Sequence, residues 1–192
     1  MNAQLTEIMR LITNLIRTGT VTEVDRDNWL CRVKTGELET NWINWLTLRA
    51  GNSRTWWKPS VGEQVVLFSL GGNLETAFAL PAVYSNQFPP PSDSEDGSVT
   101  EYPDGGWFEY EPETGRWYVR GIKSMVIEAA DNVTFKTQNF VLEADTTRIN
   151  SNVVINGAVN QGGGPMDSNG IVVDKHAHNK VKSGGDTSGG PV

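Results

Sequence analysis

The residues best suited to chemistry in this chain are its two histidines, His176 and His178, which lie two positions apart near the C-terminus. On an extended backbone this spacing directs both imidazoles to the same side. Two imidazoles hold a metal weakly, but three copies of the chain around a threefold axis would supply six nitrogens. Such an octahedral set suits iron, nickel or cobalt better than zinc, which prefers four ligands. Because the set leaves no coordination position open, we expect a structural metal, no catalytic residue and no other cofactor site.

A short repeat precedes the histidines and predicts the element that would position them. The pattern apolar–any–apolar–polar occurs at residues 117–120, 125–128, 133–136, 140–143, 147–150 and 153–156, with Thr147 as the one weak match. In an extended segment the first and third side chains of each unit share one face. The steps between units are 8, 8, 7, 7 and 6 residues, so the repeat predicts a structure that tapers toward the C-terminus.

A single copy of this repeat would bury too little apolar surface to be stable, because six units wound three per coil give only two coils. Three copies wound around one axis would point every apolar face into a shared interior and pair the strand edges between chains. The repeat therefore predicts an intertwined triple-stranded β-helix in a homotrimer, on the order of 30 Å long at ~4.7 Å per strand. A flat antiparallel meander is the alternative, although its tight turns would need more Gly and Asn-Gly than the repeat contains.

The N-terminal part of the chain predicts one helix and a small β-barrel. Residues 2–17 predict a helix that Gly19 would end, with an apolar stripe formed by Leu5, Ile8, Met9, Ile12, Leu15 and Ile16. This stripe could pack against two further copies, the chain's own barrel or a partner. Strand candidates follow at 20–25, 29–34, 40–48, 61–70 and 75–84, and they predict a five-stranded barrel of the OB type.

Aromatic residues are frequent in the predicted barrel and at the entrance to the predicted β-helix. We expect Trp42, Trp45, Trp56 and Trp57 to fill the barrel core or a subunit contact, because too few basic residues surround them to bind single-stranded nucleic acid. Between residues 102 and 119 the bulky aromatic side chains are expected to pack where the β-helix is widest, namely Trp107, Tyr110, Trp117 and Tyr118.

Two sets of acidic residues could suggest a cation site or a glycosidase pair. The segment 88–97 is rich in proline and then in acidic residues, so we expect Asp93, Glu95 and Asp96 to belong to a solvated linker. No sequence feature shapes a cleft around the alternating acidic residues of the next segment, and we expect an outward polar row of Glu109, Glu111 and Glu113.

The composition limits the class of protein. The net charge is −7, and three copies would carry 3 × −7 = −21, which disfavours general binding of nucleic acid. The one cysteine, Cys31, forms no intrachain disulfide and is expected to pack as a small apolar residue. The chain has neither a signal-peptide pattern nor an apolar run long enough to span a bilayer, so we expect a protein that is assembled in the cytoplasm of the producing cell.

The order of these elements resembles the baseplate assembly protein V family, the central spike proteins of contractile-tailed phages and R-type pyocins. The similarity covers an N-terminal helix at 1–18, an OB domain at 19–92, a β-helix needle at 93–156 and a glycine-rich apex at 157–192. Its most specific feature is the pair His176 and His178 after the shrinking repeat.

The resemblance implies a mainly β homotrimer whose pointed apex holds one iron ion (Fe²⁺) through six histidine nitrogens from His176 and His178. It also implies a place in the phage or pyocin particle, where the spike caps the tail tube, docks on a baseplate hub and pierces the outer membrane of a Gram-negative cell. The implied role is structural, without enzymatic activity, small-molecule substrate or nucleic-acid partner.

Three other interpretations remain open at the level of sequence. One is a trimeric carbohydrate-binding fibre or tailspike, which would also be built on a β-helix. Another is a metalloenzyme in which Asp174, His176 and His178 form a facial ligand set. Within the spike interpretation, a type VI secretion tip is a close relative, and polar residues of the apex could line a further ion site, among them Asn150, Asn152 and Asn156.

Overall fold

The structure is a computed structural model that describes residues 3–173 and residue 184. The chain divides into two compact units, Met1–Glu128 and Ala129–Val192. In the described part of the chain, the first unit contains one α-helix, a β-barrel and a separate three-stranded sheet, and the second contains the short strands β10 and β11. None of the helices in the described part of the chain has the length and hydropathy needed to span a bilayer.

The N-terminal helix α1 (Ala3–Leu15) continues directly into strand β1 (Ile16–Asp25). It ends earlier than the predicted 2–17, because the β-branched residues that follow favour an extended backbone. The prediction that Gly19 stops the helix is wrong. Gly19 lies inside β1, where a Cβ atom would approach Val33 Cγ1 to 2.5 Å and the Lys34 carbonyl oxygen to 2.7 Å, so glycine allows β1 and β2 to pack closely.

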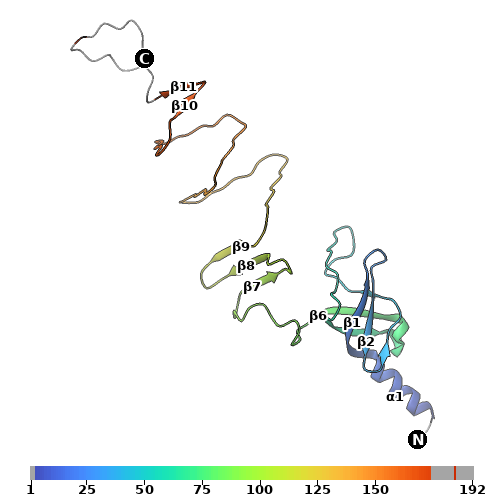
Figure 1. The fold of residues 1–192 in the computed structure, drawn as a ribbon. Helices are drawn as coiled ribbons and strands as arrows, with labels where there is room; N and C mark the ends of the chain where they lie inside the picture. The colour runs from blue at the N-terminus through green and yellow to red at the C-terminus, as the bar shows by residue number, and fades with distance from the viewer. Residues whose placement is uncertain (1–2, 174–183, 185–192) are drawn as a thin grey trace. The chain divides into compact units, whose positions relative to one another are not determined.

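The predicted barrel of the OB type is confirmed, and Figure 1 shows its strands curling around one another. Besides β1 it contains β2 (Leu30–Thr35), β3 (Leu38–Glu39), β4 (Ile43–Trp45), β5 (Gln64–Ser69) and β6 (Ala77–Val83). The strand order is β1-β5-β6-β4-β2-β3, and an additional pairing of β1 with β2 closes the barrel. Every pairing is antiparallel except β4 with β6, and β3 extends only the β2 edge. The two short 3₁₀ turns η1 (Leu70–Gly72) and η2 (Leu74–Thr76) connect β5 to β6.

The barrel core consists of small and medium apolar side chains that alternate along the strands. Its buried members are Val21, Cys31, Val33, Ile43, Val65, Leu67, Ala77 and Ala79. Cys31 is completely buried, as predicted. Of the two places expected for the tryptophans, the barrel core is not filled by them, since among the described tryptophans only Trp45 packs against it, from a partly buried position; a subunit contact stays a prediction. Trp56 and Trp57 are 61% and 64% exposed, because the narrow interior is already filled by the smaller residues.

A second sheet follows the barrel and is fully antiparallel. It consists of β7 (Ser98–Glu101), β8 (Trp107–Glu111) and β9 (Arg116–Arg120) in that order. β9 contains the first unit of the predicted repeat, which therefore pairs within its own chain.

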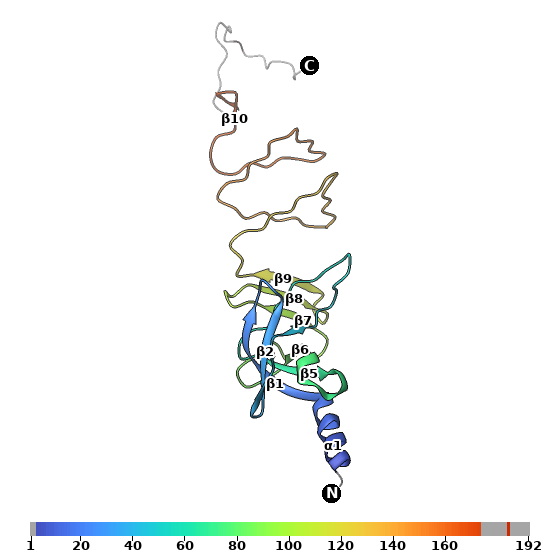
Figure 2. The ribbon, with the colours of Figure 1, turned by 90° about the vertical axis from the view of Figure 1, so that its right-hand side faces the viewer.

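The chain after β9 forms no strand until the short hairpin of β10 and β11. Residues 121–166 are all described, and none of them belongs to a strand, as Figure 2 shows by the absence of strand arrows between β9 and β10. The short hairpin β10 (Asp167–Ser168) and β11 (Ile171–Val172) then turns through Asn169 and Gly170, which both have positive φ. This segment is not a flat meander, because its units do not pair with one another within the chain.

Candidate functional site

The apolar side chains of the repeat remain exposed, and their exposure alternates along the backbone. In the second unit Val126 is 86% exposed, whereas Met125 and Ile127 on either side are 57% and 61% exposed. In the segments 140–142 and 153–155 the middle residue is again more exposed than the residues on either side. The first and third residues of a unit therefore lie on one side of the chain and the middle residue on the other, as predicted. We call the first and third residues of the six units the apolar rows.

Neighbouring units place their apolar rows in contact. Phe135 is the third residue of its unit and Phe140 is the first residue of the next, and their ring centroids are 5.5 Å apart. The connecting turn is fixed by Thr137, whose hydroxyl donates a hydrogen bond to the carbonyl oxygen of Asn139 at 3.0 Å. At this junction the rows of the two units therefore lie on the same side.

The backbone of this segment forms no strand pairing within the described part of its own chain. Across the described residues 122–165, no backbone N–H donates to a backbone carbonyl oxygen of the same chain. Buried backbone groups must be paired, so the rows can be covered only by something that also supplies strand hydrogen bonds. Other strands, and not a flat apolar surface, satisfy both requirements.

One face of the β7–β9 sheet contains the apolar residues of the first repeat unit. Cross-strand pairing places Phe108 opposite Val119 and Tyr110 opposite Trp117, so these four side chains share a face. Trp117 is 68% exposed, and Trp117 and Val119 are the first and third residues of the first repeat unit. Of the four aromatic residues predicted to pack together, Tyr110 and Trp117 lie on this face. Phe108 was not predicted, although strict alternation along residues 107–111 would have placed it beside them.

The opposite face of the sheet forms a network of its own. Glu109 accepts hydrogen bonds from Trp107 Nε1 at 2.8 Å and from Arg116 Nη2 at 3.0 Å. The Arg116 guanidinium, followed by the Trp107 indole, lowers the pKa of the Glu109 carboxyl. The guanidinium carbons of Arg116 and Arg120 lie 4.4 Å and 4.6 Å from the ring centroids of Tyr118 and Trp107 respectively. The Glu109 carboxylate therefore finds its partners within this face.

The expected outward row of Glu109, Glu111 and Glu113 is therefore only partly correct. The Glu109 carboxylate is paired, with 17% of its side chain exposed. Glu111 Oε1 accepts a hydrogen bond from the backbone N–H of Glu113 at 3.1 Å, which stabilises the turn between β8 and β9. The carboxylates of Glu109 and Glu111 have local structural partners, and Glu111 and Glu113 line the open hollow described next.

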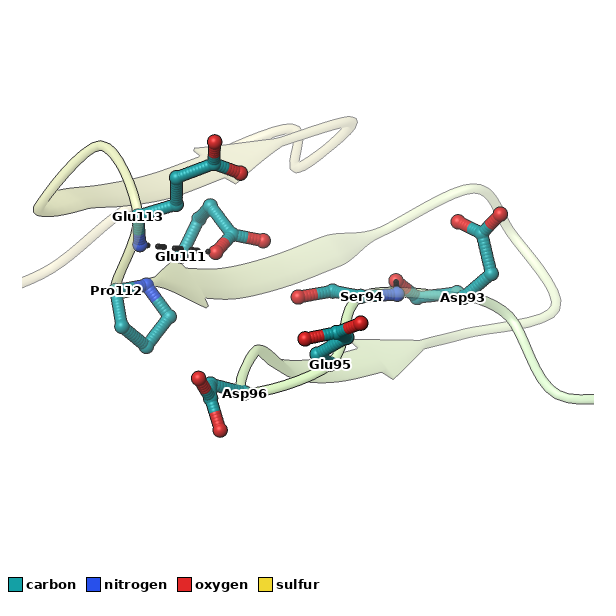
Figure 3. A pocket seen from close by; sticks show the side chains of 8 residues that line it. Asp93, Ser94, Glu95, Asp96, Glu111, Pro112 and Glu113 are labelled. Atoms are coloured by element: carbon teal, nitrogen blue, oxygen red, sulfur yellow. Dashed lines mark hydrogen bonds between the residues drawn. The ribbon is translucent and has the colours of Figure 1, made fainter.

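Acidic residues of the linker, together with Glu111 and Glu113 at the β8–β9 turn, line an open hollow of about 860 Å³. Figure 3 shows that the carboxylates of Asp93 and Asp96 point in different directions and do not converge on one point. Within the described residues, no group of three or more His, Cys, Asp or Glu side chains is placed to hold a metal ion. The hollow agrees with the expected solvated linker. The predicted ligands His176 and His178, and Asp174 of the alternative set, lie outside the described residues.

Comparisons with known proteins agree with the barrel and extend to the whole chain. Residues 17–84, which include nearly all of the barrel, match the family described as the type VI secretion system/phage-baseplate injector OB domain. The chain is also 40% identical over 209 aligned residues to the spike protein of Escherichia phage P2. That alignment covers 99% of this chain and 98% of the phage protein.

Proposed function

The chain belongs to the family of phage baseplate spike proteins, and we propose that three copies of it form the membrane-piercing spike at the tip of a contractile tail. The family is structural, so the chain is a component of the baseplate spike and not an enzyme. This agrees with the prediction from sequence and disfavours the metalloenzyme alternative. The carbohydrate-binding fibre has no comparable support.

The observation that carries the trimer is the combination of exposed apolar rows with an unpaired backbone. When three copies wind around one axis, the rows of each chain face those of the other two, and the backbone groups pair between chains. Each of these side chains contributes roughly 1.5–3 kcal/mol when it becomes fully buried. The aromatic face of the β7–β9 sheet would cover the wide end of the same interior, and the shrinking repeat would narrow it.

Puncture requires stiffness and an apex that does not fray. Interchain strand pairing without free edges provides the first property. His176 and His178 of three chains would supply six imidazole nitrogens, a donor set that fits one iron ion. When bound, the metal would join the three chain ends and fill its coordination sphere with protein ligands.

The barrel and the repeat have separate tasks in this proposal. The barrel at 19–92 would dock on the baseplate hub and cap the tail tube, in a phage virion or a pyocin. The needle at 93–156 and the apex at 157–192 would enter the outer membrane of a Gram-negative target when the sheath contracts. The match of residues 17–84 to an injector OB domain supports the first assignment.

Native mass spectrometry of the purified chain, together with metal analysis, tests this proposal. We expect a mass of three chains and one third of an iron ion per chain. A monomer whose C-terminal half is nevertheless protected from proteolysis would contradict it, because a single chain would then have an adequate interior of its own.

A further inference from the structure

The apolar stripe of α1 has the spacing of a coiled coil. Leu5, Ile8, Ile12 and Leu15 are separated by three, four and three residues, which is the a/d pattern of two heptads. All four side chains are exposed, from 41% for Leu15 to 55% for Ile12. A helix of 13 residues is marginal when isolated, so a partner that covers this stripe would stabilise it.

The chain's own barrel does not cover the stripe, because α1 contacts the barrel through another side. Asn14 is buried, and its Oδ1 accepts a hydrogen bond from Arg17 Nη1 at 2.9 Å. Gly72 of η1 approaches the Leu11 backbone so closely that a Cβ atom would lie 2.3 Å from the Leu11 carbonyl oxygen. These contacts anchor the last turn of α1, and Figures 1 and 2 show the rest of the helix extending away from the barrel.

The charges of α1 are placed so that identical helices can meet. The two charged residues of the helix, Glu7 and Arg10, form an ion pair at 2.6 Å on the side away from the stripe. The positions that flank a coiled-coil seam carry neutral residues here, including Met9 and Leu11. Three identical helices can therefore approach without bringing like charges together.

We propose that α1 helices of three copies pack along this stripe as a short parallel three-helix bundle. The inference rests on the proposed function, because the repeat would bring three chains together in the same direction. Leu at a with Ile at d, as in Leu5 and Ile8, favours three or four strands. Ile12 and Leu15 form the combination that favours two, so the repeat and not the helix sets the number of chains. Three tethered copies raise the effective concentration enough for a two-heptad bundle to form.

Disulfide cross-linking of the full chain tests the bundle. Ile12→Cys places a thiol in the seam, and Arg10→Cys places a matched thiol on the outer side of the same turn. Dilute protein is oxidised gently and separated by non-reducing denaturing electrophoresis. We expect Ile12→Cys to form covalent dimers at least ten times faster than Arg10→Cys, with up to two of every three chains cross-linked. The native Cys31 is buried in the barrel core and leaves this readout unaffected.

The native mass of each variant separates failure of this inference from failure of the trimer. Equal cross-linking rates in a trimeric protein would overturn the bundle alone and indicate that the stripe docks on a different protein. A monomeric mass would overturn the trimer and the bundle together. As a second measurement, Ile8→Asp should accelerate amide exchange across residues 5–15 at least tenfold in the trimer, whereas Thr6→Asp should not. Unchanged exchange in Ile8→Asp would also overturn the bundle.

Discussion

Cys31 is a residue whose reactivity follows from its position in the barrel core. Burial, and to a smaller extent the charge of Glu63, raises the pKa of the Cys31 thiol to about 11. The pKa of the Cys31 thiol is therefore higher in the folded chain than in the unfolded chain. The stability that folding gains from keeping this thiol neutral is complete below the unfolded pKa and is lost as the pH rises through about 11. We expect a thiol reagent at about pH 8 to label the unfolded chain fully and the native chain hardly at all. Rapid labelling of native protein would contradict this burial.

Glu109 predicts a dependence of stability on pH that runs in the opposite direction to that of Cys31. Its hydrogen bonds from Arg116 and Trp107 favour the carboxylate, so the pKa of Glu109 is lowered. The stability that it contributes is present above the unfolded pKa and is lost as the pH falls through the folded value. The NMR signal of the Trp107 indole N–H should therefore titrate with a midpoint below the ordinary glutamate range.

Glu109→Gln should abolish this titration, and Glu113→Gln, a change in the exposed turn, should leave it intact. If the indole signal of Trp107 titrates at the ordinary glutamate pKa, or survives in Glu109→Gln, the pairing on this face of the sheet is incorrect.

At the scale of secondary-structure elements, the sequence was informative where turn residues and alternation coincide. The pattern predicted the OB type of the barrel, and the structure has a strand in each of the five predicted segments, whereas the two-residue strand β3 was not predicted. It did not reveal that Gly19 belongs to a strand, because a glycine after an apolar stripe resembles a helix end until the partner strand is known. The sequence could not decide whether Trp56 and Trp57 lie in the core or outside it, since hydrophobicity does not show how much volume a five-stranded barrel can enclose.

The close approach of β1 and β2 at Gly19 leads to a stability prediction. Gly19→Ala would place a methyl group 2.5 Å from Val33 Cγ1 and 2.7 Å from a backbone oxygen, so the strands would have to separate. We expect it to destabilise the barrel by about 1–3 kcal/mol, as overpacking commonly does. Chemical unfolding would measure the loss.

Gly51→Ala is the matched control, because no atom lies within 4 Å of the added methyl group and the backbone does not require glycine. It should change the unfolding free energy by less than about 0.5 kcal/mol. Equal effects of the two substitutions would show that the β1–β2 approach does not require glycine.

At the scale of the whole molecule, the repeat predicts a homotrimer, whose contacts between chains are not visible in a single chain. The alternation of its side chains is present in the single chain, but strand partners for the backbone of residues 122–165 are not. Sequence reasoning could propose three chains because too few units are available for a single-chain coil. It could not predict that the first unit pairs as β9 within its own chain, since that pairing depends on the turn between β8 and β9.

Two adjacent residues of the second unit test the assembly. Ile127 belongs to the apolar rows and Val126 points to the other side. In a trimer, Ile127→Asp would bring three carboxylates into one apolar layer, at a cost of several kcal/mol. Val126→Asp would add them to the outer surface, with an effect within about 0.5 kcal/mol. Analytical ultracentrifugation should show dissociation of Ile127→Asp at concentrations where Val126→Asp remains trimeric. Dissociation of both variants, or of neither, would contradict the assignment of the rows.

The histidine pair gives the final prediction, because it separates the metal from the trimer. The rows would hold the chains together along the repeat, whereas six imidazoles would join only their ends. His176→Ala removes three of the six nitrogens, so we expect the iron to be lost while the mass of three chains is retained. Because a coordinating imidazole must be neutral, the unmodified protein should retain its metal at neutral pH and release it as the pH falls. Elemental analysis with native mass spectrometry measures the metal content and the mass of the assembly.

A stoichiometric metal in His176→Ala would exclude this residue as a ligand. Dissociation of that variant into monomers would instead mean that the metal, and not the repeat, holds the trimer together.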